Sequence, residues 1–200
     1  MGIVERRTMT PSEHLTGAKF EAIVKERCVQ LKNLRLADIG RYGVQAVRTG
    51  DAWQVMQSLP DFEGVSREGR QTIFDSKVCS QSSFALDKYR LETKGSRARQ
   101  LKHMLDRSEF GVRCFFLIHW NERQLTTRKE PAVTYAFPVE MWHPFWRSFL
   151  AGEVKSIKRS DCETYGHAIA WNHVSGTDRK LRPDILAAVV QTPHEVEIGA

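Results

Sequence analysis

Apolar residues at helical spacing open the ordered part of the chain. Thr16 can cap a helix whose apolar positions follow at intervals of three or four residues: Phe20, Ile23, Val24, Cys28 and Leu31. This spacing predicts an amphipathic helix. The preceding residues, 1–15, mix charged and polar side chains and predict a flexible N-terminal arm. A short strand and turn are predicted between Gly43 and Gly50, with Gly40 in the connection before them; residues 51–60 favour no element.

A β-hairpin is predicted next. Residues 61–65 form its first arm, and residues 71–78, which are rich in strand formers, form its second arm after a turn containing Ser and Gly. Side chains alternate between the two faces of a strand, so Ile73, Asp75 and Lys77 share one face. Asp75 and Lys77 therefore point the same way.

The rest of the pattern predicts two helices and two strands. An amphipathic helix starts near Ser96, the apolar run 112–120 suits a central strand buried on both faces, and residues 133–137 suit another strand. A helix is expected over residues 139–150. Its aromatic side chains are more typical of a core or a dimer interface than of a platform for stacked bases: Trp142, Phe145, Trp146 and Phe149. These elements predict an α/β domain, residues 16–200, with a mixed sheet flanked by helices.

Composition narrows the class of protein. The 200 residues, 41% of them hydrophobic, suffice for one domain with a sizeable core. A net charge of +6 favours a polyanionic partner such as nucleic acid. No signal-peptide pattern or membrane-length apolar run occurs, so we expect a soluble, cytoplasmic protein. The cysteines and histidines show no metal-ligand spacing, which favours reduced, buried thiols and structural imidazoles.

Two carboxylates and a lysine form the strongest chemical motif. Pro60-Asp61 lies on the first arm of the hairpin and Asp75-Ser76-Lys77 on the second, so pairing of the arms brings the side chains together. Carboxylates hold hard cations such as Mg²⁺, and a nearby lysine offsets the charge that develops on a phosphate during hydrolysis. The alternative for so short a motif is a salt-bridged, solvated strand face. Glu21, on the first helix, can supply a further acid.

Basic side chains concentrate between residues 88 and 107. Such a run is often only a solvated face, but next to a metal site it favours contact with DNA phosphates. The predicted DNA-binding residues are Lys88, Arg90, Lys94, Arg97, Arg99 and Lys102.

A longer set of motifs resembles one family. The chain is similar to the RecU family of Holliday junction resolvases over about residues 17–190. The resemblance rests on segments that occur in the same order: 17–21, 58–64, 73–77, 83–86, 99–101, Gly111 before the apolar strand, 152–157, 166–169 and Leu186.

This resemblance implies a restriction-endonuclease-like fold, a homodimer, and Mg²⁺-dependent symmetric nicking of four-way DNA junctions, with Mn²⁺ able to substitute. It implies that Asp61 and Asp75 are metal ligands, that the backbone carbonyl of Ser76 is a third, and that Lys77 is the catalytic lysine. Gln100 matches a family position near the active site, and Glu21 matches the acidic position of the first helix.

Two departures from the family pattern stand out. The insertion that forms a junction-entering stalk before the first metal-binding Asp is short here, since only residues 43–59 are available. Asp75 also stands where the resolvases usually have Glu. Two alternatives therefore remain beside a resolvase: a repair or restriction-type endonuclease on the same fold, and a DNA-binding accessory protein without activity.

Overall fold

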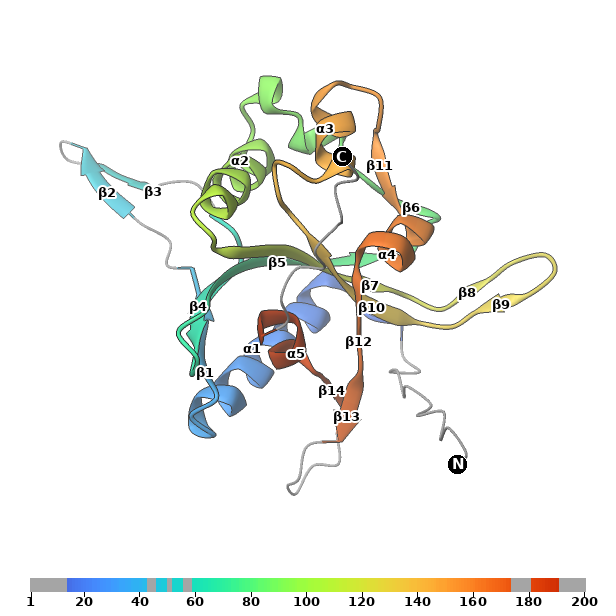
Figure 1. The fold of residues 1–200 in the computed structure, drawn as a ribbon, viewed down its shortest axis with the longest axis horizontal. Coiled ribbons are helices and arrows are strands. Elements are labelled where there is room, and N and C mark those ends of the chain that lie inside the picture. Colours follow the sequence, from blue (N-terminus) through green and yellow to red (C-terminus); the bar gives the residue numbers. More distant parts are fainter. Residues whose placement is uncertain (1–13, 43–45, 50–51, 56–58, 174–180, 191–200) are drawn as a thin grey trace, which may run out of the picture.

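A six-stranded mixed sheet forms the centre of the protein (Figure 1). The computed structural model describes residues 14–42, 46–49, 52–55, 59–173 and 181–190. Only β5 and β7 run parallel, and every other pair in the sheet is antiparallel. In spatial order the strands are β1 (Ala37–Arg41), β4 (Phe62–Ser66), β5 (Gln71–Cys79), β7 (Arg113–Trp120), β10 (Val133–Pro138) and β12 (His167–Ile169).

Helices cover both faces of this sheet (Figure 1). On one face lie α1 (Gly17–Asn33) and α5 (Ile185–Val190), whose buried residues share a core with Phe62, Phe74 and Phe115. These three rings stack in sequence, with centroids 4.9 Å apart at each step. The other face carries α2 (Ser96–Glu109), α3 (Pro144–Leu150) and α4 (Arg159–Tyr165) over a second core. The α/β fold predicted from the sequence, a mixed sheet flanked by helices, is confirmed.

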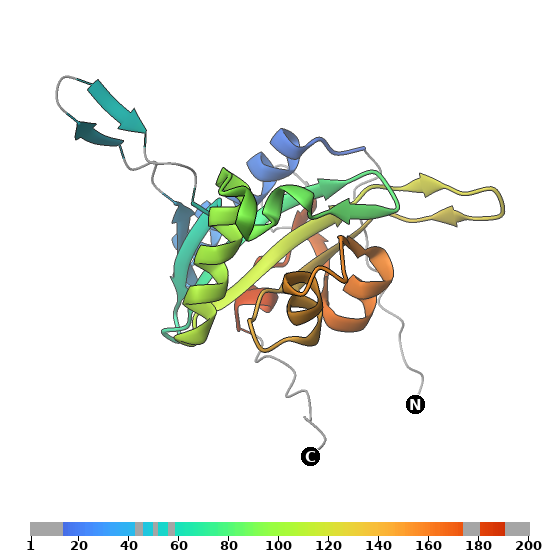
Figure 2. The ribbon, with the colours of Figure 1, turned by 90° about the horizontal axis from the view of Figure 1, so that it is seen from above.

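Two hairpins project from opposite ends of the sheet (Figures 1 and 2). The first, β2 (Ala46–Thr49) with β3 (Ala52–Val55), lies between β1 and β4 in the chain. The second, β8 (Arg123–Gln124) with β9 (Lys129–Glu130), connects β7 to β10. The remaining short elements are β6 (Ser83–Ala85), which pairs with β11 (Ser156–Lys158), β13 (Trp171–His173), which pairs with β14 (Leu181–Pro183), and the 3₁₀ turns η1 (Asp87–Tyr89) and η2 (Leu91–Thr93).

The pattern predicted most of these elements. The first helix is capped as expected, since the Thr16 hydroxyl accepts a hydrogen bond from the Lys19 backbone N–H at 3.3 Å. The β4–β5 hairpin, the helix from Ser96 and the buried strand β7 are also confirmed. All four cysteines are free and buried. No helix in the described ranges is long and apolar enough to cross a membrane.

Other predictions were wrong at particular residues. The helix expected over residues 139–150 begins only at Pro144, because proline suits the first turn of a helix and His143 caps it. Its ring cluster is buried as expected except for Trp142, which is half exposed before the helix. Gly40 lies inside the edge strand β1 rather than in a connection. Of the expected N-terminal arm, residues 1–13 lie outside the described ranges, and Leu15 is buried and exchanges two hydrogen bonds with Asn121.

The close pairing of β1 with β4 depends on Gly64. A Cβ atom at this position would overlap the carbonyl oxygen of Asp38 on β1. We expect Gly64→Ala to destabilise the protein by roughly 1–3 kcal/mol, as overpacking does. Gly40→Ala is the matched control, because a Cβ there meets no atom within 4 Å. Urea unfolding of both variants tests this, and equal stability of the two would contradict it.

Candidate active site

The two carboxylates meet where β4 and β5 separate. Strand pairing ends at Phe62 with Phe74, so Asp61 and Asp75 are the next residues on the two arms. Beyond this point Asp61 replaces the strand partner: its Oδ2 accepts hydrogen bonds from the Ser76 backbone N–H and from the Ser76 hydroxyl, both at 3.0 Å. The hairpin predicted from the sequence therefore brings the acids together and fixes one of them to the opposite strand.

Lys77 completes the cluster. Its Nζ lies 2.6 Å from Oδ2 of Asp75 and 3.9 Å from Oδ2 of Asp61. Strand alternation places Asp75 and Lys77 on the same side as Ile73, which belongs to the core beneath α2. The trio predicted from the sequence is thus one contiguous site on the α2 face of the sheet.

The two carboxyl groups differ in acidity. Asp75 is 0% exposed, and burial raises its pKa to about 7; Lys77 opposes this increase, while the neighbouring Asp61 adds to it. Burial also acts to raise the pKa of Asp61, but interactions with Asp75, Lys77 and Ser76 outweigh burial and lower it. Of the two acids, Asp75 is therefore the one that takes up a proton first, as the pH falls to about 7.

The oxygens of this site fit a hard cation. Both carboxylate oxygens of Asp75 are buried; Lys77 forms an ion pair with Oδ2, and Oδ1 has no hydrogen-bond partner among the described residues. Because the N–H and C=O of a strand residue point to the same neighbouring strand, the Ser76 carbonyl faces the same edge as its N–H, towards Asp61. In the part of the chain that the structure describes, no three His, Cys, Asp or Glu side chains come together in a group that could hold a metal ion. Two carboxylates and a carbonyl suit Mg²⁺, which keeps several water ligands.

Gln100 supports the site from α2. Its side-chain amide donates a hydrogen bond to the backbone carbonyl of Leu59 at 3.1 Å, two residues before Asp61. The Asp61 carbonyl in turn accepts from the Tyr42 backbone N–H at 3.0 Å. Gln100 is buried near the active site, as the family position implies. Its contact is with the backbone that leads to Asp61.

Glu21 does not join the cluster. It forms an ion pair with Arg41 at the end of β1, and no hydrogen bond or ion pair within the described ranges links it to Asp61, Asp75 or Lys77. Arg41 follows Ile39 by two residues, so their side chains lie on the same face of β1. Ile39 packs in the core beneath α1, and the ion pair therefore belongs to the α1 side of the sheet. The expectation that Glu21 supplies a further acid beside the metal is therefore not supported by its contacts.

The predicted DNA-binding residues lie on η1, on either side of η2 and on the first half of α2. Their surroundings differ. Arg97 lies over the ring of Tyr89 and Arg90 over that of Phe149, with guanidinium-to-centroid distances of 5.8 Å and 5.6 Å. Lys102 forms an ion pair with Asp106, so its charge is offset. The other three side chains are exposed: Lys88, Lys94 and Arg99.

Tyr89 is a residue of the site that the sequence pattern did not indicate. It is fully buried, and its hydroxyl has no hydrogen-bond partner among the described residues. Burial raises its pKa, and the negative charge of Asp75 adds to this effect while Arg97 opposes it. Tyr89 therefore lies between the basic surface and the carboxylates. Its ring contacts come from Phe84 and Phe116, far apart in the sequence.

Comparison with known proteins identifies the family. The family described as RecU, recombination protein U, matches residues 17–176, a range that contains the whole cluster. The chain belongs to the RecU family. This is the family of Holliday junction resolvases that the sequence motifs resemble, and its members are nucleases. The RecU match favours a resolvase over the two alternatives left open by the sequence.

Two further comparisons accompany this match. A solved structure of Hjc, a Holliday junction resolvase from Archaeoglobus fulgidus, is similar to this RecU protein with 15% sequence identity and a TM-score of 0.43. The similarity covers 76% of this chain and 95% of Hjc. No curated protein matches the chain in a sequence search.

The raised pKa of Asp75 predicts an unusual effect on stability. The pKa of this carboxyl rises on folding, from its ordinary 3.8 to about 7. Its contribution to the stability of the fold is therefore complete below pH 3.8 and is lost as the pH rises through about 7. Asp75→Asn, which removes the buried charge, should therefore raise the melting temperature of the metal-free protein at pH 8 by at least about 2 °C. Near pH 4 the two proteins should melt alike. Calorimetry in EDTA tests this; a lower melting temperature for the variant at pH 8 would contradict it.

Proposed function

We propose that this RecU protein cuts Holliday junctions with one or more Mg²⁺ ions held by Asp61, Asp75 and the backbone carbonyl of Ser76. The observation that supports this most strongly is the adjacent pair of acids, of which Asp75 is fully buried and keeps a raised pKa although Lys77 lies 2.6 Å from it. A carboxylate in such a place is unfavourable unless a cation compensates it. Mn²⁺, which accepts the same oxygen ligands, should substitute.

Each residue of the cluster has a distinct part in this proposal. When bound, the metal ion supplies positive charge at the phosphate and lowers the pKa of a water molecule. Lys77 places a second positive charge beside the carboxylates, where negative charge develops on the phosphate. Ser76 fixes the Asp61 side chain through two hydrogen bonds, and Gln100 fixes the backbone before it. These two contacts keep Asp61 in place before the substrate arrives.

DNA binds across the α2 face in this proposal. Arg97, whose guanidinium group lies over the ring of Tyr89, places positive charge at the edge of the site. Exposed cations follow on η1 and after η2, namely Lys88 and Lys94. We assign phosphate contacts to the predicted set except Arg90 and Lys102, whose charges Glu92 and Asp106 offset.

A homodimer follows from the symmetry of the substrate. A four-way junction is resolved by two matched incisions in opposite strands, and two copies of one active site related by a two-fold axis supply them. Membership of the RecU family supports this assembly. Paired nicks at symmetric positions are the expected products.

Removal of either acid should abolish cleavage. We expect Asp61→Ala and Asp75→Ala to lower the rate of junction cleavage in Mg²⁺ by at least about 10²-fold, and Lys77→Ala by a similar factor. Gln100→Ala, which loosens only the support of Asp61, should cost roughly tenfold. The assay is single-turnover cleavage of a labelled four-way junction.

Asp38→Ala is the matched control, because Asp38 is an exposed carboxylate whose ion pair is with Lys32, away from the cluster. All the variants should still bind the junction, since the phosphate contacts remain. Cleavage by Asp75→Ala at the wild-type rate would contradict the proposal, as would a wild-type protein that cuts no branched DNA in Mg²⁺.

The β2–β3 hairpin stands at the chain position of the family's stalk and projects from the sheet (Figure 2). We propose that it provides the preference for junctions. Replacement of residues 46–55 by a short Gly-Ser linker should leave cleavage of linear duplex unchanged and lower the preference for a four-way junction of the same sequence at least about tenfold, equivalent to ~1.4 kcal/mol. An unchanged ratio of junction to duplex cleavage would show that the hairpin has no such role.

A further inference from the structure

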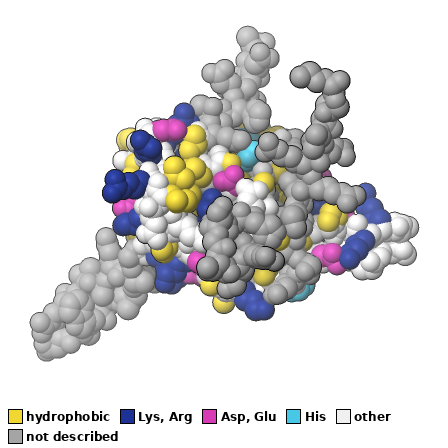
Figure 3. All heavy atoms as spheres, turned by 90° about the horizontal axis from the view of Figure 1, so that it is seen from below, with side chains coloured by type: hydrophobic (Ala, Val, Ile, Leu, Met, Phe, Trp, Pro, Cys, Tyr) yellow, Lys and Arg dark blue, Asp and Glu magenta, His cyan; other side chains and the backbone are white. Residues whose placement is uncertain are grey.

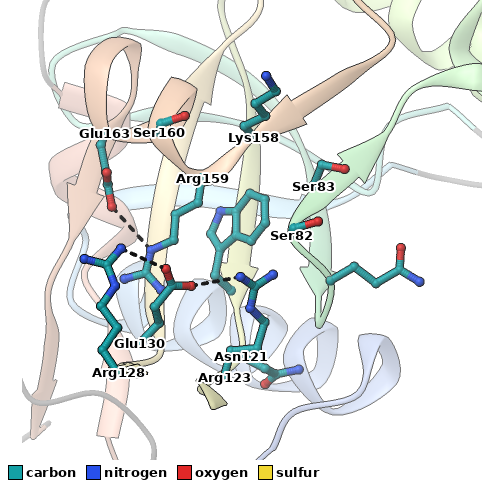
Figure 4. A pocket seen from close by; sticks show the side chains of 12 residues that line it. Ser82, Ser83, Asn121, Arg123, Arg128, Glu130, Lys158, Arg159, Ser160 and Glu163 are labelled. Atoms are coloured by element: carbon teal, nitrogen blue, oxygen red, sulfur yellow. Dashed lines mark hydrogen bonds and ion pairs between the residues drawn. The ribbon is translucent and has the colours of Figure 1, made fainter. Parts of the chain in front are cut away.

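A polar cavity of about 370 Å³ lies at the base of the β8–β9 hairpin (Figure 4). Its walls come from the end of β7, the hairpin itself, the start of β6 and the start of α4. We infer that this cavity is a second phosphate-binding site, which holds the backbone of the DNA substrate away from the cleaved bond. The inference rests on the proposed function, since it requires that DNA is the substrate.

The charge of the cavity is the first argument. Four basic side chains line it, Arg123, Arg128, Lys158 and Arg159, against two acidic ones, Glu130 and Glu163. Arg123 and Arg128 share the single carboxylate of Glu130, at 3.3 Å and 3.2 Å. Arg159 pairs with Glu163 at 3.3 Å.

These ion pairs hold the guanidinium groups in place without neutralising the cavity, because two carboxylates face four cations. The two remaining charges suit the oxygens of a phosphodiester, for which arginine is a particularly good partner. The cavity is therefore preorganised for an anion.

Neutral donors are also present. Ser82 and Ser83, before and within β6, and Ser160 on α4 line the same cavity (Figure 4). Arginine, lysine and serine side chains together are the usual ligands of DNA phosphates. The combination indicates contact with the sugar-phosphate backbone rather than with a base.

The position of the cavity links it to the active site. Trp120, which lines the cavity, belongs to the same core beneath α2 as Ile73, so the cavity and the catalytic trio open on the same side of the sheet. Lys77 and Gln81 both lie on β5 or directly after it, four residues apart (81 minus 77), which corresponds to about 13 Å along a strand. A DNA strand bound at Lys77 can thus reach the cavity within a few nucleotides.

The opposite face of the protein differs in how its charged side chains are distributed. The surface that carries α1 and α5 shows basic side chains scattered among acidic and uncharged ones (Figure 3). On α1, for example, Lys32 is paired with Asp38 and Lys25 is exposed. This face therefore offers controls with the same charge change.

The test compares two double variants. Arg128→Gln/Lys158→Gln removes two exposed cations of the cavity, one of them in a surface ion pair. Lys32→Gln/Lys25→Gln removes the same number on α1, again with one from a surface ion pair. Binding of a four-way junction is measured by fluorescence anisotropy in EDTA, where no cleavage occurs, between 50 and 200 mM KCl. Melting curves confirm that both variants are folded.

We expect the cavity variant to reduce the slope of log affinity against log salt by about 1.8, about 0.9 for each lost phosphate contact. The control variant should keep the wild-type slope. Wild-type affinity and slope in the cavity variant would overturn the inference, and so would an equal change in both variants, which would indicate a general effect of net charge. If the wild-type protein bound no DNA, the proposed function itself would fail.

Discussion

The burial of the Asp75 carboxyl group is the constraint on which the site depends. This group has no solvent exposure, and its pKa is raised to about 7 although Lys77 lies 2.6 Å away. The positive charge of Lys77 alone therefore does not offset the cost of two neighbouring negative charges at a site from which water is excluded. A divalent cation would supply the missing positive charge. In this account the metal-free site is held in an electrostatically unfavourable state that metal binding relieves.

The fold creates this state by separating two strands at one residue. Phe62 and Phe74 are paired and stacked, and they anchor β4 to β5 immediately before the acids. Past them, the edge of β5 is free of β4, so Ser76 binds the Asp61 side chain rather than a strand. The parallel partner β7 supports the other edge of β5 along its whole length. The acids thus lie where β4 leaves β5, next to a paired and stacked end of β4 and on a strand whose other edge is paired with β7.

Much of this site was predictable because it depends on local rules. The alternation of side chains along a strand put Asp75 and Lys77 on one face, and a hairpin put Asp61 opposite them. What could not be predicted depends on contacts between distant segments. Tyr89 reaches the site through a 3₁₀ turn with no periodic pattern, and β1 is an edge strand of five residues, too short for its alternation to stand out. The partner of Glu21 was not predictable either, because spacing along α1 does not say which charged side chain, here Arg41, lies across the interface.

The function of this site depends on whether Asp61 and Asp75 together hold a divalent metal ion. Titration of the DNA-free protein with Mn²⁺, followed by calorimetry, measures this directly. We expect the wild-type protein to bind Mn²⁺, and Asp61→Asn and Asp75→Asn each to lose this binding. The Mn²⁺ affinity of the wild-type protein should weaken below about pH 7, as Asp75 takes up a proton. Undiminished Mn²⁺ affinity in both variants would contradict it.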